Sequence, residues 1–357
     1  MKIKKLFCIR NIIRLPTVIL GIYICLRYAA ECTKGIENGI LFCIEVLAPS
    51  LFLFMALSSY IVKCGFAQIL AKPLGKLTRF LFRLPPIAAS AILLSMIGGY
   101  PVGARIACML YESGELSASE ARKTACIAVC AGPGFLLNYV GRALIGSVEA
   151  GTVLLASQII GMLLTGFIAG RLIPSKPEYS RRAVTAQASG NLLTGSVESA
   201  SRSIFQLCGM VVICSALIEV IATGSPSGIV TDIASAMVEI TTGCDRMCGR
   251  YPLHLIAFFI GFGGISVHLQ IYAGMGKLSL NKGLFFLCRI IQGIFTAAAA
   301  YILFMVFPIQ QSVFNSTDAP LTFSRSATLA GSAALVLSSL CFLGSIRRLK
   351  LKRQYHN

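Results

Sequence analysis

A basic side chain stands beside a helix-breaking motif inside one of the most apolar stretches of the chain. The segment SMIGGYPVGARIACMLY carries Gly98, Gly99, Tyr100 and Pro101 at its middle, and Arg105 follows four residues after the proline. A guanidinium at membrane depth costs about 2.5–3.5 kcal/mol on the insertion scale, so it must face protein, water or a ligand. It can bind a carboxylate through two parallel hydrogen bonds, and these residues are therefore candidates for substrate binding.

The proline predicts where a helix begins. Proline suits the first turn of a helix because its missing N–H would be unsatisfied there anyway. The segment therefore reads as two half-helices that cross together, with the second starting at Pro101. The first N–H groups of that second half form a positive helix end, which suits an anion or a carbonyl oxygen. The alternative is that Arg105 neutralises Glu112 or Glu115, or reaches the lipid headgroups.

Two further apolar segments are interrupted. In FGGISVHLQI, the pair Gly263 and Gly264 breaks the span, and Ser266, His268 and Gln270 follow. Ser266 and Gln270 are four residues apart and share one helical face, whereas His268 points elsewhere and is either a ligand or a packing residue.

The third interruption is CAGPGFLLNYVG, with a turn at Gly132 and Pro133. Asn138, shortly after it, either donates to a ligand or caps a helix.

The composition places these breaks in a membrane. The chain has 357 residues, 56% hydrophobic and 13% charged, with a mean hydropathy of +0.78. Apolar runs of about 20 residues recur along it and predict an all-α polytopic membrane protein. The net charge of +18 lies in short loops, where it acts as a topology signal and contacts lipid headgroups, so we expect no nucleic-acid partner.

No residue pattern points to catalysis. The chain has no Ser/His/Asp set, no H-E-x-x-H pattern and no phosphate loop, so we expect neither an enzyme nor a cofactor or bound metal. Most of the 14 cysteines lie in apolar spans as small hydrophobes. Cys244 and Cys248 form the one loop pair, which could be a metal site or a disulfide but is better explained as two unpaired thiols.

The charges between the spans predict the topology. We expect about eight transmembrane helices plus re-entrant or broken helices, near 15–30, 40–63, 85–111, 146–170, 204–222, 252–275, 283–307 and 326–346. Both termini are then cytoplasmic, the acidic loop ESGELSASE is outside, and the basic linker after residue 170 is inside, provided that 119–141 is re-entrant. The corresponding regions are an N-terminal span (1–35), a first repeat (36–172), a polar linker (173–190), a second repeat (191–307) and a C-terminal span with a basic tail (308–357).

The two halves are related in sequence. GGYPVGARIA (98–107) aligns with GGISVHLQIY (263–272), sharing two glycines, a valine and an isoleucine, and each is followed by Gly-x-Leu-Ser. In the expected topology the first copy starts outside and the second inside. The pattern therefore predicts an inverted internal repeat, with interrupted spans at matching positions as found in transporters.

Five motifs in order resemble the sporulation integral membrane protein YlbJ family, whose members carry the nucleoside-recognition, or Gate, domain. They are LAPSLFLFMALS (47–58), GGYPVGARIA (98–107), the Gly132-Pro133 turn, VEITTGC (238–244) and GGISVHLQ (263–270). The resemblance places the family's Gly-Tyr-Pro motif at Gly99, Tyr100 and Pro101 and its basic position at Arg105. The chain departs from the family just before the turn, where Val129-Cys130-Ala131 replaces polar residues, and at Leu53, where the family has a second proline.

The resemblance implies transport of dipicolinic acid, a planar aromatic dianion, across the outer forespore membrane during sporulation. The expected partners are therefore a small-molecule substrate and the lipid bilayer, and a homo-oligomer is compatible with the sequence. Two alternatives stay open: a carrier of nucleosides or another polar solute, and a membrane scaffold that transports nothing.

Overall fold

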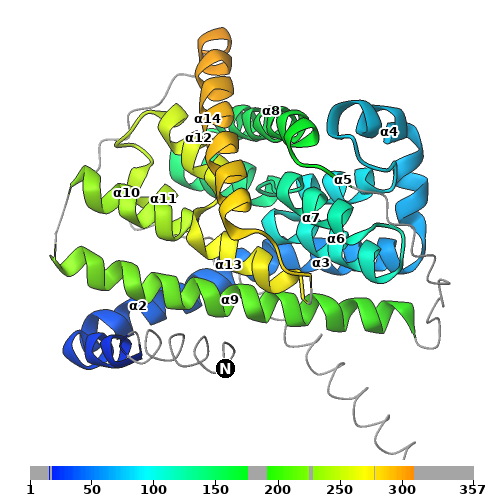
Figure 1. Ribbon diagram of the computed structural model, residues 1–357. Coiled ribbons are helices and arrows are strands. Elements are labelled where there is room, and N and C mark those ends of the chain that lie inside the picture. Colours follow the sequence, from blue (N-terminus) through cyan, green and yellow to red (C-terminus); the bar gives the residue numbers. More distant parts are fainter. Residues whose placement is uncertain (1–15, 17, 176–190, 225–227, 277, 309–357) are drawn as a thin grey trace, which may run out of the picture. The chain divides into compact units, whose positions relative to one another are not determined.

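A computed structural model describes residues 16, 18–175, 191–224, 228–276 and 278–308 (Figure 1). Helices make up the described part, and no strand occurs within it. The predicted span 326–346, the basic tail and most of the linker 173–190 lie outside the described residues.

The first half of the described chain is a series of short and long helices. Its elements are α2 (Ala29–Phe42), the π-helical turn η1 (Cys43–Leu47), α3 (Ala48–Lys63), α4 (Phe66–Phe82), α5 (Ala88–Gly98), α6 (Tyr100–Glu112), α7 (Ala118–Ile127), the π-helix η2 (Gly134–Ile145) and α8 (Val148–Leu172). The second half consists of α9 (Leu192–Gly224), α10 (Ile229–Val238), α11 (Ile240–Met247), α12 (Leu253–Phe262), α13 (Gly264–Gly274) and α14 (Lys282–Val306).

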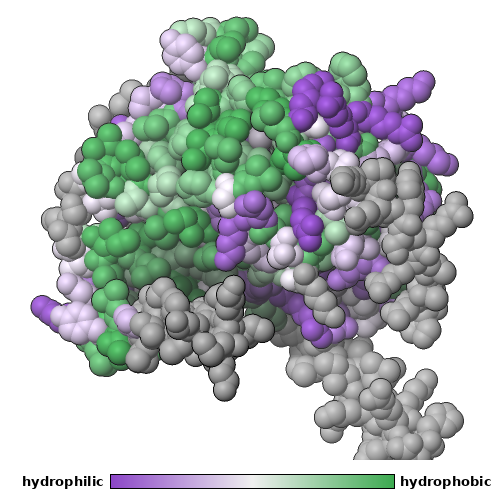
Figure 2. All heavy atoms as spheres, viewed as in Figure 1, coloured by the Kyte–Doolittle hydropathy of each residue, from purple (hydrophilic) through white to green (hydrophobic). Residues whose placement is uncertain are grey.

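Four helical segments of the described part are long and apolar enough to cross a membrane. They are α8, most of α9, the pair α12–α13 and α14, and a bent pair formed by α2–η1 and α3 would make a fifth. Large hydrophobic side chains such as Phe205 and Ile213 on α9 are well exposed, and hydrophobic residues cover much of the face in Figure 2. Such a surface is suited to lipid, so the predicted all-α membrane class holds, while the count of eight spans stays a prediction.

The segments on either side of Gly99 fold back on each other. Helices α5 and α6 form as the sequence predicts, but they pack side by side instead of end to end. A Cβ on Gly103 would lie 2.7 Å from the Cβ of Ser95, eight residues earlier. Residues eight apart in one straight helix are about 12 Å apart. Segment 88–112 is therefore a helical hairpin whose tip is Gly99.

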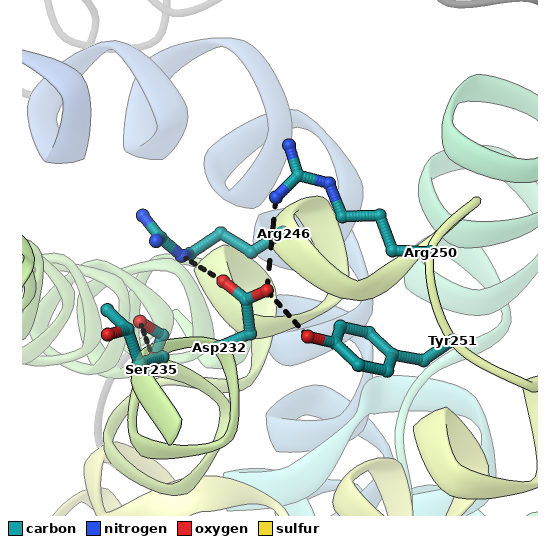
Figure 3. A network of polar contacts seen from close by, with 6 residues as sticks. Asp232, Ser235, Arg246, Arg250 and Tyr251 are labelled. Carbon is teal, nitrogen blue, oxygen red and sulfur yellow. Dashed lines mark hydrogen bonds and ion pairs between the residues drawn. The ribbon is translucent and has the colours of Figure 1, made fainter. Parts of the chain in front are cut away.

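A second hairpin is formed by α10 and α11, with its tip at Glu239. A Cβ on Gly243 would lie 2.6 Å from the Cβ of Ala236 on the other arm. Asp232, in the first turn of α10, ties the base together (Figure 3). Its Oδ1 accepts from Nε of Arg246 at 2.9 Å, and its Oδ2 accepts from the hydroxyl of Tyr251 at 3.0 Å. The buried carboxylate thus joins the start of one arm to the end of the other.

The hairpin at 88–112 overturns the predicted position of the acidic loop. Lys123 Nζ, just after that loop, donates to the carbonyl of Gly170 at 2.9 Å. Arg171 donates to the carbonyl of Leu81, just before the hairpin, at 3.2 Å. The chain therefore enters and leaves the hairpin on the same side as the end of α8. The charge pattern requires only that one of segments 85–111 and 119–141 turns back, and in the structure the first one does.

The remaining two pairs are interrupted without folding back. Helices α12 and α13 meet at Gly263, which has φ 86°, and together form one candidate span. Helix α7 and η2 are separated by residues 128–133, and they do not pack along each other. The aligned copies 98–107 and 263–272 therefore have different structures, because the first turns back at its glycines and the second continues.

Thiol accessibility tests this arrangement. In a background freed of accessible native thiols, we expect Glu115→Cys and Arg171→Cys to react with a membrane-impermeant maleimide from one side. Arg142→Cys, at the opposite end of α8, should react from the other side. Labelling of positions 115 and 142 from the same side would show that 88–112 crosses.

Candidate functional site

The two hairpin tips and the two breaks, between α7 and η2 and between α12 and α13, meet at one place. A Cβ on Gly99, at the first hairpin tip, would lie 3.5 Å from the backbone nitrogen of Gly132, in the break between α7 and η2. A Cβ on Gly264, at the break between α12 and α13, would lie 3.2 Å from the nitrogen of Ile240, at the second tip. The hydroxyl of Tyr100 donates to the carbonyl of Ile260 at 2.8 Å and so joins the two groups.

Side chains satisfy the backbone groups that the breaks release. Arg289, fully buried in α14, donates to the carbonyl of Cys126 at the end of α7. Gln292 donates to the carbonyl of Val129 at 2.8 Å and accepts from Arg289 at 2.6 Å. His268 Nδ1 lies 2.6 Å from the carbonyl of Gly264. These polar residues thus stabilise non-helical backbone that water does not reach.

Two cavities flank the meeting point. The first has about 510 Å³ of empty space between α3, α6, α9 and α13, and its lining includes Arg105, Ser58, Ser59, Ser203, Gln206 and Gln270. The second, of about 480 Å³, lies between the hairpin tips and is lined by Gly99, Tyr100, Gly132, Glu239, Thr241 and Gln270 among others.

Arg105 is the one charged residue in the lining of the first cavity. Its guanidinium donates to the hydroxyl of Ser199 on α9, and it forms no ion pair with any described residue. The alternative pairing is absent from the described contacts: Glu112 lies near the thiol of Cys108, and Glu115 accepts from Gln68. The partly buried cation therefore faces the cavity without a carboxylate.

Glu239 is the charged residue of the second cavity. It is only 2% exposed and caps the N-terminus of α11. Its Oε1 accepts from the N–H of Thr241 at 3.0 Å, and its Oε2 accepts from the N–H of Thr242 at 2.8 Å. The helix end compensates the buried negative charge.

The structure places the predicted site residues in two groups. Those lining the cavities are Gly99, Tyr100, Pro101, Arg105, Gly132 and Gln270. Those outside both linings are Gly98, Pro133, Asn138, Gly263, Gly264, Ser266 and His268.

The second group has local explanations. Asn138 is exposed on η2, and Ser266 accepts a hydrogen bond from Gln270 at 3.1 Å. The His268 ring packs among phenylalanine rings, with its Nε2 buried and without a described partner. Val102 N–H, at the expected positive helix end, is taken by the carbonyl of Gly99 at 3.2 Å.

Several polar residues in or beside the cavities were missed from the sequence. Ser199, Ser203 and Gln206 lie near one face of apolar α9, a spacing that indicates a polar environment beside a membrane helix. Glu239 was missed because it stands in VEITTGCDRMCGR, which reads as a loop. The structure instead puts Cys244 inside α11 and Cys248 at its end, both as free thiols.

The fold and the site define the class as an all-helical membrane protein whose interrupted helices meet beside two cavities. The chain is similar to the sporulation integral membrane protein YlbJ of Bacillus subtilis (strain 168), with 22% identity over 303 residues that cover 72% of this chain and 74% of the relative. The family resemblance indicated by the five motifs is thereby confirmed. No family model matches the chain, and no solved structure matches it.

The cap formed by Glu239 can be tested by stability. We expect Glu239→Gln to lower the free energy of unfolding by about 1–3 kcal/mol, because one oxygen becomes a donor facing a buried N–H. Glu198→Gln is the matched control, since Glu198 is exposed in a surface pair with Arg202, and it should change stability by less than about 1 kcal/mol. Thermal unfolding in one detergent measures both, and equal shifts would contradict the role of the cap.

Proposed function

We propose that the chain is a membrane carrier, not an enzyme, and that it moves a small carboxylate anion during sporulation. The substrate we propose is dipicolinate, moved across the outer forespore membrane, with both termini of the carrier cytoplasmic. The observation that carries the proposal is Arg105, a cation without an ion pair among the described residues, in the lining of the cavity between α3, α6, α9 and α13.

The polar groups around Arg105 suit a dicarboxylate. One carboxylate can take a bidentate pair from the guanidinium. The hydroxyls of Ser58 and Ser59 and the amide of Gln206 line the same cavity. Ser203 and Gln270 also line it, but they donate to the carbonyl of Ser199 and to Ser266. Ser59 supports this assignment because its hydroxyl is buried and has no described partner, and an unmet buried hydroxyl is costly unless a ligand or water completes it.

The rest of the cavity suits a flat aromatic ring. Pro101, Val102, Ile106, Met109 and Leu207 give the lining an apolar surface. Glu239 lines only the second cavity. A dianion is therefore expected in the first cavity, beside Arg105, because the second would place it next to a carboxylate.

The arrangement of breaks supports a transport role. Hairpin α5–α6 is followed by the interrupted pair α7–η2 and the long helix α8. Hairpin α10–α11 is followed by the interrupted pair α12–α13 and the long helix α14, which packs against α8. We propose that these two series form the inverted repeat, in a different register from the sequence alignment. Binding sites of such carriers lie where the repeats meet.

A carrier of nucleosides or another neutral polar solute is the second candidate. Glu239, Thr241 and Gln270 in the second cavity favour it, since hydroxyl and amide groups need such partners. A scaffold that transports nothing is the third, and it would not require Arg105.

Uptake by vesicles carrying the purified protein separates these candidates. We expect saturable uptake of labelled dipicolinate, with KM raised roughly 10- to 100-fold in Arg105→Ala as one charge-assisted hydrogen-bonded contact is lost. Arg105→Lys should keep part of the affinity. It keeps the positive charge but loses the planar guanidinium that forms two parallel hydrogen bonds to a carboxylate.

The matched control is Arg202→Ala, which removes an exposed arginine of α9 that is paired with Glu198, and its uptake should equal that of the wild type. Uptake unchanged by Arg105→Ala would remove Arg105 from the site. Uptake of uridine in place of dipicolinate would favour the second candidate, and no uptake of either would favour the scaffold.

A further inference from the structure

Helix α4 has three distinct faces. Ala71, Gly75, Thr78 and Phe82 form the face that packs on the protein, where Gly75 lies against Pro86. A second face carries Lys72, Lys76, Arg79 and, at the helix end, Arg83, all exposed. A third carries Phe66, Ile69, Leu77 and Phe80, which are 48–68% exposed. Each set repeats at three- or four-residue spacing, so each forms a stripe along the helix.

The two outer stripes are unpartnered within the described structure. None of the four basic residues forms an ion pair with a described residue, and α4 contains no acidic residue. At 100° per residue, the basic stripe lies between the packed face and the apolar stripe. Hydrophilic residues gather over the part of Figure 2 where α4 and the end of α8 lie in Figure 1.

The charge of one stripe and the apolar character of the other together indicate what binds to this surface of α4. Helix α4 is not among the described helices that are long and apolar enough to cross a membrane. A helix with an apolar stripe beside a basic one lies in the plane of the interface, with the apolar side chains among acyl chains and the cations at the headgroups. Anionic headgroups complement four unpaired cations, whereas a zwitterionic surface does not.

We propose that α4 is a binding surface for anionic lipid headgroups, formed by Lys72, Lys76, Arg79 and Arg83. The first hairpin begins six residues after α4 ends, and Pro86 in the connection packs on Gly75. Anionic lipid therefore binds the helix that is connected directly to the α5–α6 hairpin. The tip of that hairpin lies at the cavities. This proposal is independent of the substrate, because no α4 residue lines either cavity.

The chain contains no tryptophan, so a single introduced one reports its own surroundings. Full-length Phe80→Trp is placed in phosphatidylcholine vesicles that contain brominated phosphatidylcholine or, at the same mole fraction, brominated phosphatidylglycerol. We expect both lipids to quench the tryptophan at position 80. The anionic lipid should be enriched there by on the order of fivefold for each basic residue that meets the headgroups.

Two controls isolate the basic stripe. Lys72→Gln, Lys76→Gln and Arg79→Gln together should lower the enrichment of the anionic lipid to what Arg83 alone supports, on the order of fivefold or less, while quenching by brominated phosphatidylcholine persists. Arg142→Gln, Arg202→Gln and Lys282→Gln together remove the same net charge elsewhere and should keep the preference. Ile213→Trp, on the exposed apolar face of α9, should show no preference.

Two results overturn the proposal. Equal quenching by both lipids at position 80 without the glutamine substitutions would show that the basic stripe does not select anionic lipid. Absence of quenching by either lipid would show that protein, such as a second copy of the chain, covers the apolar stripe. Size-exclusion profiles of each variant, compared with the wild type, confirm that the fold is retained.

Discussion

The structure depends on one constraint, which is that backbone groups freed inside a membrane have no water to bond and must be satisfied by the protein. Four helix breaks come together here, and side chains bind freed backbone groups at three of them. Arg289 and Gln292 bind the carbonyls at the end of α7, Tyr100 binds the carbonyl of Ile260 in the last turn of α12, and Glu239 accepts from the first N–H groups of α11. A fully buried arginine is costly in itself, so its hydrogen bonds to a broken helix explain why the chain retains it without a carboxylate partner among the described residues.

This constraint also produces the cavities. The glycines at the breaks let the backbones of different helices approach closely, and the two cavities lie beside this meeting point. The polar groups divide into two kinds as a result. Arg289, His268 and Glu239 bind backbone and hold the breaks, whereas Arg105 and Ser59 face empty space with bonding capacity left over. Arg105 and Ser59 are therefore the groups that a solute can bind. A carboxylate is the group that a cation without an ion pair binds best.

Residue types and spacing predicted the breaks but not their geometry. Gly98-Gly99-Tyr100-Pro101, Gly132-Pro133 and Gly263-Gly264 all interrupt helices, as expected from residues that free or block the backbone. The folding back of 88–112 depends on the small Gly103 packing against Ser95, a long-range contact that no local pattern reveals. Loop charges could not decide it either, since they fix only how many segments turn back. Arg105 and Gln270 were found because polar groups in apolar spans are rare, while Glu239 was hidden in a polar stretch.

The central claim is that the cavity beside Arg105 is where a carboxylate binds. Thiol protection tests it most directly, in a background freed of accessible native cysteines. Ser203→Cys places a thiol in the cavity, and Ser201→Cys places one on the same helix outside both linings. The account predicts that dipicolinate slows alkylation at position 203 in a saturable manner and leaves position 201 unaffected. Protection at neither position, or equal protection at both, would contradict it.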